Sequence, residues 1–339
     1  MRCWLAALLS CFWLVALVAV PGEAKAWGKF GHLAVCDLAY RNLTPTSRAV
    51  MGDLLQSRSG GITVRGRGRA ADRHYSAFNM GCLEEDALPR RNPDDHFLNL
   101  DRSAAAVTGA ACPRAPVSCI LAGIERDVAI LRDAGRSRED RVFALMAIGH
   151  WVGDIHQPLH VSFADDRGGN GIQIALQARC GGASPRPDSL HGVWDNCLLE
   201  AGLFEKVRRR AEFRKSWSRN TITYRAVDTM MANTDLAQER ALVGGEPWRW
   251  AQESYLIARA PETLYCTLHG GVCRYSAEAA VLARNGAQRT QALDAAYLTR
   301  FAPVAEERIR RAGFRLAHVL NKALDPGYRE PLRNGSQPS

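Results

Sequence analysis

His150-Trp-Val-Gly-Asp154-Ile-His156-Gln-Pro-Leu-His160 brings three histidines and an aspartate into one short stretch of the chain. On a helix, His150 and Asp154 lie one turn apart on the same face. An imidazole beside a carboxylate suits a zinc ion. Pro158 should end or bend the helix, so that His160 turns toward a neighbouring metal. His156 is out of step with the pair, and we interpret it as a structural residue.

The same His-x-x-x-Asp spacing returns in Leu190-His191-Gly-Val-Trp-Asp195. For one such pair, a surface ion pair or a helix-end contact is an equally good explanation. The chain offers further histidines, His32 and the one in Asp94-Asp95-His96-Phe97-Leu98-Asn99. This many histidine and carboxylate ligands indicates more than one zinc site.

Helical periodicity extends over much of the chain, so we expect a mainly α fold: a single compact helical domain with one small β-hairpin. Thr44-Pro45 should divide His32–Leu55 into two helices, and Gly168–Leu176 alternates like a strand. The glycine- and arginine-rich Ser57–Arg69 should be an exposed loop. Further helices are expected over Cys119–Leu131, Arg141–Val152, Trp248–Ala260 and Asp294–Leu324, the last interrupted at Ala312-Gly313.

The beginning of the chain reads as a secretory signal peptide, residues 1–26. Arg2 precedes an apolar run from Cys3 to Val20, and Ala24-Lys25-Ala26 offers a small-x-small cleavage site. An uncleaved membrane anchor is the alternative. Cleavage would make Trp27 the first residue of a domain over 27–325, followed by a disordered tail over 326–339. The protein would then be secreted or periplasmic.

The composition of the chain agrees with an exported protein. Eight cysteines follow the leader, an even number that predicts disulfides in an oxidising compartment. The close pairs Cys112/Cys119 and Cys266/Cys273 could each close a loop, but the pairing as a whole is not readable. The formal net charge of +9 favours polyanionic partners weakly. No phosphate-cradling Walker loop or dinucleotide-binding turn is present.

Taken in order, these segments resemble the trinuclear-zinc nuclease family of the fungal single-strand nucleases and plant bifunctional nucleases. The resemblance covers most of the chain after the leader and implies the fold shared by zinc-dependent phospholipase C and single-strand nucleases. The matching segments are Trp27-Gly28-Lys29-Phe30-Gly31-His32, His96-Phe97, His150 to His160, Gly168-Gly169-Asn170-Gly171-Ile172 and Leu190 to Asp195.

The resemblance implies three zinc ions, one of them bound by the processed N-terminus itself. That zinc would take the α-amino nitrogen and carbonyl oxygen of Trp27, together with His32 and a bridging Asp154. An extended or acylated Trp27 could not offer this amine, so secretion and activation would be coupled. The other two zincs would be held by His96, His150, Asp154 and an upstream aspartate, and by His160, His191 and Asp195.

The upstream aspartate has two candidates because the family's usual Trp-Ala-Asp motif is missing. We prefer Asp86, since the following Ala87-Leu88-Pro89-Arg90 resembles the run found in bacterial members. Asp72 is the alternative. The resemblance also implies catalytic roles: the upstream aspartate would orient or deprotonate the attacking water, and Asp154 would bridge two metals.

Substrate contacts follow from the same resemblance. Phe97 occupies the position that stacks a nucleobase, which favours single strands because paired bases expose no face. Asn99 stands where the family can have a base-reading aspartate, which leaves base preference open. Arg90 or Arg91 would bind the phosphate. Asn170 would contact substrate, although a turn-forming role explains it equally well.

The predicted activity is endonucleolytic cleavage of single-stranded DNA and RNA, with 3′-nucleotidase activity on 3′-nucleotides. A zinc-dependent phospholipase C is the enzymatic alternative, and the Gly-Gly-Asn hairpin and basic charge favour the nuclease. A non-catalytic, exported zinc-binding or nucleic-acid-binding protein is the second alternative. Structural zinc sites are usually closed and rich in sulfur, unlike the ligands inferred here.

Overall fold

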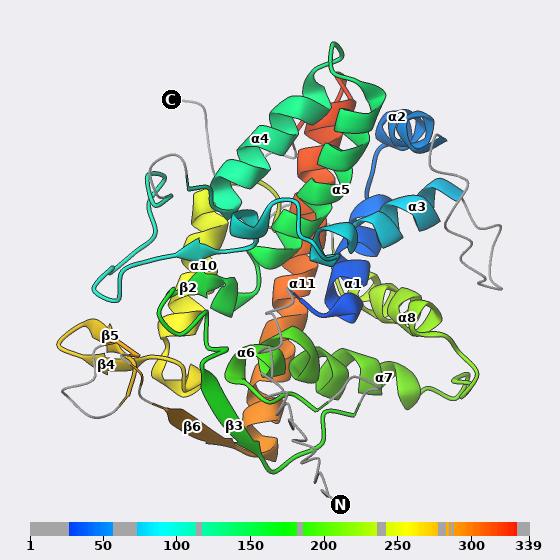
Figure 1. Ribbon diagram of the computed structural model, residues 1–339. Coiled ribbons are helices and arrows are strands. Elements are labelled where there is room, and N and C mark those ends of the chain that lie inside the picture. Colours follow the sequence, from blue (N-terminus) through cyan, green and yellow to red (C-terminus); the bar gives the residue numbers. More distant parts are fainter. Residues whose placement is uncertain are drawn as a thin grey trace, which may run out of the picture.

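Helices make up most of the structure, and the longest, α11 (Ala295–Leu324), runs through the middle of it (Figure 1). The computed structural model describes residues 27–56, 73–112, 117–181, 186–235, 242–276, 283–284, 286 and 288–330. The predicted leader, the predicted loop over 57–69 and residues 331–339 of the predicted tail lie outside these residues. The other long helices are α1 (Lys29–Arg41), α2 (Pro45–Leu55), α3 (Arg73–Gly81), α4 (Ile120–Arg132), α5 (Arg138–Asp154), α8 (Arg219–Ala232) and α10 (Pro247–Arg259).

Short helical segments connect the long helices and carry several predicted site residues. The α-helical ones are α6 (Leu190–Gly192) and α7 (Glu205–Arg208), and the π-helical ones are η5 (Val193–Cys197) and η6 (Glu200–Phe204). The 3-10 segments are η2 (Glu84–Asp86), η3 (Pro93–His96), η4 (Pro158–His160) and η7 (Pro261–Thr263).

Helix α5 is the central helix of the site, because it is buried on all sides along its second half. Ser137 begins it as N-cap by accepting a hydrogen bond from the Asp140 N–H at 3.0 Å. Every residue from Ala144 to Asp154 is buried, as expected of a helix in the core. The helix ends before Pro158, as the sequence predicts.

The expected division of His32–Leu55 into two helices is confirmed. Thr44 caps α2 by accepting from the Ser47 N–H, and Pro45 stands in the first turn, where its missing N–H is not needed. The expected interruption of α11 at Ala312-Gly313 is wrong, because the helix is continuous there. Gly313 is instead the point where α1 approaches, since a Cβ at this position would lie 2.5 Å from a Leu38 methyl group.

The strands are short and lie at one side of the helices. The predicted strand is present as β3 (Ile172–Leu176), but it pairs in parallel with β6 (Arg289–Leu293) and so forms no hairpin. The hairpin is formed elsewhere, by β4 (Thr267–His269) and β5 (Val272–Arg274). The third pair is parallel and joins β1 (Leu98–Asn99) to β2 (Val161–Ser162).

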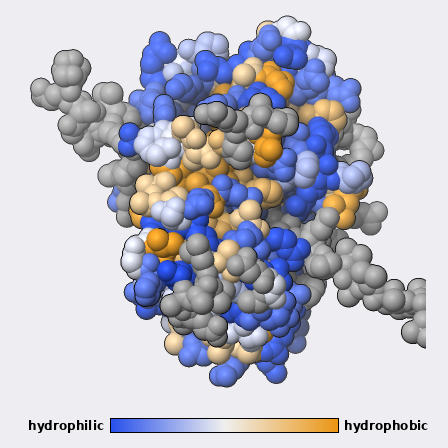
Figure 2. Space-filling model, turned by 60° about the vertical axis from the view of Figure 1, so that its left-hand side comes forward, coloured by the Kyte–Doolittle hydropathy of each residue, from blue (hydrophilic) through white to orange (hydrophobic). Residues whose placement is uncertain are grey.

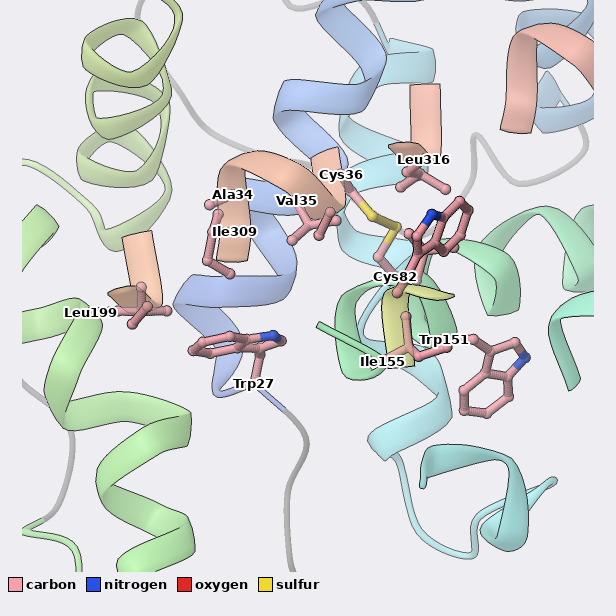
Figure 3. Packing of buried hydrophobic residues seen from close by; sticks show 14 of the residues in the cluster. Trp27, Ala34, Val35, Cys36, Cys82, Trp151, Ile155, Leu199, Ile309 and Leu316 are labelled. Carbon is pink, nitrogen blue, oxygen red and sulfur yellow. A yellow bond between two sulfur atoms is a disulfide. The ribbon is translucent and has the colours of Figure 1, made fainter. Parts of the chain in front are cut away.

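All eight cysteines among the described residues are paired, as their even number predicts. The two close pairs suggested by the sequence are confirmed, whereas the other two join more distant segments. The Cys36–Cys82 bond, visible in Figure 3, connects α1 to the residue that follows α3. The four bonds are Cys36–Cys82, Cys112–Cys119, Cys180–Cys197 and Cys266–Cys273.

Trp27, the first described residue, is fully buried. Figure 3 shows it within the same cluster of apolar residues as Leu199 and Ile309. Its indole Nε1 donates to the Gly153 carbonyl oxygen at 2.9 Å, and the N–H of Gly28 donates to the Asp195 carbonyl oxygen at 2.9 Å. The chain is therefore anchored beside two segments that carry predicted ligands.

The outer surface mixes polar and apolar residues. Figure 2 shows hydrophilic residues above and below a more apolar area on one face. None of the described helices is both long and apolar enough to cross a membrane. The large apolar side chains that are exposed come from separate stretches of the chain: Leu88, Val117, Tyr224, Leu256 and Leu268.

Candidate metal centre

The structure brings the predicted histidine and aspartate ligands, though not the Trp27 backbone atoms, together into three groups of nitrogen and oxygen atoms that could each hold a metal ion. Nearly all of their members are buried; Asp86 is half-buried. The first group is His96, His150 and Asp154; the second is His160, His191 and Asp195; the third is His32, Asp86 and His150.

The first group forms an equilateral triangle of ligand atoms. His150 Nε2, His96 Nδ1 and Asp154 Oδ2 lie 3.2 Å from one another along all three edges. Ligands bound to a tetrahedral zinc at about 2.0–2.1 Å would be separated by roughly 3.3 Å. The spacing therefore fits one face of such a coordination shell.

The second group is built where α5 has ended. His160 lies on η4, as expected from Pro158, and its Nε2 lies 3.2 Å from His191 Nε2. Asp195 Oδ2 lies 3.3 Å from His191 Nε2, and Asp195 Oδ1 lies 3.9 Å from His160 Nε2. The four-residue spacing thus brings the side chains of His191 and Asp195 together, although Asp195 lies in a π-helical segment and His191 in an α-helical one.

Asp154 connects the first group to His32. Its Oδ1 lies 3.2 Å from His32 Nε2, whereas its Oδ2 faces His96 and His150. The rings of His32 and His150 are stacked with centroids 4.0 Å apart. The two oxygens of one carboxylate therefore point to two different sets of imidazoles, which is the geometry that a bridging ligand needs.

Several buried polar atoms in these groups have no hydrogen-bond partner among the described residues. They are Nδ1 and Nε2 of His32, Nε2 of His96 and Oδ1 of Asp154. Burial of an unpaired polar atom costs about 1–3 kcal/mol. Because imidazole nitrogens and carboxylate oxygens are zinc ligands, a bound cation would offset that cost at His32 and Asp154. The donor set therefore fits the metal ions that the sequence predicts.

Backbone carbonyls select the tautomer of three of the histidines. Nδ1 of His150, His160 and His191 lies 2.8, 2.5 and 2.7 Å from the carbonyl oxygens of Cys82, His96 and Gly168. A carbonyl oxygen only accepts, so each Nδ1 carries a proton and each Nε2 is the nitrogen that faces the other ligand atoms. Such outer contacts orient histidine ligands in metal sites.

Burial also sets the charge of the second group. It lowers the pKa of His191 to about 3, with the neighbouring His160 acting in the same direction. It likewise raises the pKa of Asp195 well above its usual range, although a hydrogen bond from Gln157 opposes this. At neutral pH His191 is therefore a neutral imidazole, the form that a metal ion requires of a histidine ligand.

The upstream aspartate preferred from the sequence lies at the centre. Asp86, on η2, places Oδ1 3.9 Å from His150 Nε2. The alternative, Asp72, lies outside the described residues. Arg90 donates to Asp86 Oδ1 at 3.1 Å, whereas the guanidinium of Arg91 stacks on the Phe143 ring at 3.8 Å. Of the two candidate phosphate ligands, the structure brings only Arg90 to the metal ligands.

The predicted substrate residues lie close to the ligands in the chain. Phe97 and Asn99 are half-buried and follow His96 directly, where β1 pairs with the segment after His160. Asn170 closes its own turn, because its side chain donates to the Arg167 carbonyl oxygen at 2.8 Å. The turn-forming role considered for Asn170 is therefore present in the structure.

Two buried residues of the opening motif are explained by contacts that the sequence does not display. His156 donates from Nδ1 to the Val152 carbonyl oxygen and accepts at Nε2 from Arg315, so it belongs to none of the three groups. Gln157, to which we assigned no role from sequence, donates to Asp195 Oδ1 at 2.7 Å. Its place between Asp154 and His160 was the available signal.

The fold and these groups define a class: mainly helical proteins in which histidines and aspartates from distant segments form several adjoining sites suited to metal ions. Comparison with known proteins gives the family. A family model described as S1/P1 Nuclease matches residues 27–325, and the chain belongs to that family. It is accordingly a member of an endonuclease family, hydrolases that act on ester bonds of nucleic acids.

Plant proteins are among the relatives. Endonuclease 4 of Arabidopsis thaliana is 25% identical over 346 residues, which cover 95% of each sequence. Endonuclease 1 of the same plant is 26% identical over 328 residues, or 93% of this chain and 92% of that protein. Endonuclease 3 is 24% identical over 339 residues and 95% of each sequence. The similarity thus extends through all three groups.

Proposed function

We propose that this chain is a secreted or periplasmic, zinc-dependent endonuclease that hydrolyses phosphodiester bonds of single-stranded DNA and RNA and also has 3′-nucleotidase activity. The observation that carries the proposal is the equal 3.2 Å spacing of ligand atoms from His96, His150 and Asp154. Family membership supplies the reaction class, and the nitrogen and oxygen ligands favour zinc.

Three zinc ions are assigned to the adjoining groups. Asp86 completes the first group, and the second group holds one ion by itself. The ion at His32 shares Asp154 with the first group and takes the amine and carbonyl oxygen of Trp27. Burial of Trp27 and its anchoring through Gly153 support this last assignment, which requires removal of residues 1–26.

Bound zinc would supply the electrophilic chemistry, by acidifying a water molecule and stabilising negative charge on the leaving oxygen. Asp86 orients the attacking water and accepts its proton, since its half-buried carboxylate lies at the edge of the ligand cluster. Arg90 donates to Asp86, which restrains the carboxylate, and a guanidinium is the kind of group that binds a phosphate oxygen.

Substrate selection is assigned to residues next to His96. Phe97 stacks on an unpaired base, which costs a duplex the unstacking of that base and so favours single strands. Asn99 offers both a donor and an acceptor to a base edge. Asn170 contributes through its turn, which places the Gly168 carbonyl oxygen on His191.

Two competing functions are weakened by specific observations. A phospholipase C could use the same kind of metal centre, but the chain matches the nuclease family over 27–325. A purely structural zinc site usually uses cysteine thiolates, and all eight cysteines after the leader are disulfide-bonded. The same disulfides support an oxidising compartment.

The test compares protein beginning at Trp27 with protein that carries one additional residue before it. Each is assayed on single-stranded DNA, RNA, duplex DNA, a 3′-nucleotide and phosphatidylcholine vesicles, with zinc present. We expect the first protein to cleave the single strands and release phosphate from the nucleotide, and the extended protein to lose most of that activity. Cleavage of lipid alone would instead identify a phospholipase, and equal activity of the two proteins would overturn the amine ligand.

A further inference from the structure

Gln157 is a fully buried polar side chain beside the second group and is not one of the predicted ligands. It lies in the turn between α5 and η4, midway between Asp154 and His160. A buried amide is costly unless both of its polar atoms are hydrogen-bonded. Both atoms are paired here, and their partners show what the residue does.

The two ends of the amide have different partners. Nε2 donates to Asp195 Oδ1 at 2.7 Å, and Oε1 accepts from the Leu159 N–H at 2.5 Å. A backbone N–H only donates, so the atom that faces Leu159 must be Oε1, and the amide cannot be turned over. The Leu159 bond lies within one turn of chain and aims Nε2 at Asp195.

The bond to Gln157 distinguishes the two oxygens of Asp195. Oδ1 is engaged by the amide and lies 3.9 Å from His160 Nε2, whereas Oδ2 lies 3.3 Å from His191 Nε2. Because a carboxylate is planar, restraining Oδ1 also restrains the direction of Oδ2. Asp195 is thereby held with one oxygen toward the imidazoles.

We propose that Gln157 is a positioning residue that holds Asp195 as a one-oxygen ligand of the metal in the second group. The inference rests on the proposed zinc centre and adds a residue that selectively controls one of its three ions. Its side chain contacts Leu159 and two members of the second group, Asp195 Oδ1 at 2.7 Å and His191 Nε2 at 3.5 Å, and forms no hydrogen bond with the first or third group among the described residues. Outer partners of metal ligands typically change affinity by about 10–100-fold.

The experiment measures zinc bound per chain as a function of buffered free zinc, in protein beginning at Trp27. We expect Gln157→Leu and Gln157→Met to lose one ion of three at a free zinc concentration about 10–100-fold higher than the wild type does. The other two ions should dissociate as before. Gln252→Leu is the matched control, because Gln252 accepts from the Val107 N–H at 2.6 Å and belongs to none of the three groups, so this variant should keep all three ions.

A double variant separates positioning from general stabilisation. If Gln157 acts through Asp195, adding Gln157→Leu to Asp195→Ala should cause no further loss of zinc or of the zinc-dependent rise in Tm. Additive losses would overturn the inference, as would zinc curves within twofold of the wild type. Variants unfolded at every zinc concentration would also overturn it, because the defect would then lie in the fold. A wild-type chain that binds no zinc would instead overturn the proposed metal centre itself.

Discussion

At the scale of single residues, two glycines of α5 permit the close approach of the Cys36–Cys82 disulfide and of His32. A Cβ on Gly149 would lie 2.5 Å from Cys82 Sγ and 2.8 Å from Cys36 Sγ. A Cβ on Gly153 would lie 2.8 Å from His32 Nδ1. The positions immediately before His150 and Asp154 therefore have no room for a side chain unless neighbouring atoms move.

Gly149→Ala should destabilise the protein by about 1–3 kcal/mol, because neither the helix backbone nor the Cys36–Cys82 disulfide can move freely to admit a methyl group. The measurement is the midpoint of denaturant unfolding. Gly109→Ala is the control, since its Cβ would have no neighbour closer than 3.6 Å. Equal midpoints for Gly149→Ala and the wild type would contradict the packing described here.

Asp154→Asn should lower hydrolysis of single-stranded DNA by more than about 100-fold, since loss of outer partners alone costs about 10–100-fold. It should also release zinc, because one carboxylate serves both His32 and the first group. Activity and bound zinc are measured on the same sample. Asp133→Asn, at an exposed aspartate paired with Arg136, serves as control. Full zinc content in Asp154→Asn would argue against a bridging role.

At the scale of elements, α10 and α11 support the end of α5 through an ionic cluster. Glu253 accepts from Arg308 at 2.6 Å and from Arg315 at 2.6 and 2.8 Å. Both arginines also reach His156, at its carbonyl oxygen and at Nε2. Because His156 lies between Asp154 and His160, this cluster holds the turn that separates the first and second groups.

Glu253→Gln should cost about 3–5 kcal/mol near neutral pH, because it leaves two nearly buried arginines without their carboxylate. Burial opposes the shift, but Arg315 and Arg308 lower the pKa of Glu253 from 4.5 to about 2. Its stabilisation is therefore complete above about pH 4.5 and is lost as the pH falls toward 2.

Unfolding midpoints of wild type and Glu253→Gln from pH 7 down to pH 3 test this expectation. The difference between the two proteins should shrink as the pH falls. Glu262→Gln removes an exposed carboxylate that lies 3.5 Å from Arg300, and it should have little effect at any pH. A difference that stays constant with pH would mean that the charge of Glu253 is not what stabilises the cluster.

At the scale of the whole molecule, the metal groups join parts of the chain that are far apart in sequence. Ligands come from α1, η2, η3, α5, η4 and the α6–η5 segment. Bound ions would therefore connect these elements in addition to side-chain packing, hydrogen bonds and the Cys36–Cys82 disulfide. Metal binding and global stability should be coupled for this reason.

Removal of metal by a chelator should lower Tm, and added zinc should restore it. At a free zinc concentration one hundred times the dissociation constant, each site contributes about 2.7 kcal/mol. Scanning calorimetry before and after chelation measures the change, with far-UV circular dichroism to follow helix content. Magnesium is the control, since it prefers oxygen ligands and should not restore Tm. An unchanged Tm after complete zinc removal would contradict the coupling.

The sequence by itself determined the features that depend on short separations along the chain. Helical periodicity predicted α5 and α11. The His-x-x-x-Asp spacing predicted that His150 and Asp154, and likewise His191 and Asp195, lie on the same face of their helical segment. Pro45 and Pro158 marked boundaries that the structure confirms. These predictions succeed because the backbone alone fixes which residues within an element share a face.

Only the tertiary structure decided how distant segments meet, although the family resemblance had already implied which histidines and aspartates share an ion. It placed Asp86 beside His150, joined Cys36 to Cys82, and paired β3 with β6 instead of forming a hairpin. It also revealed the hydrogen bond from Gln157 to Asp195. Such contacts depend on how helices pack, on where glycines permit close approach and on which buried polar atoms need partners, and none of these is encoded in local spacing.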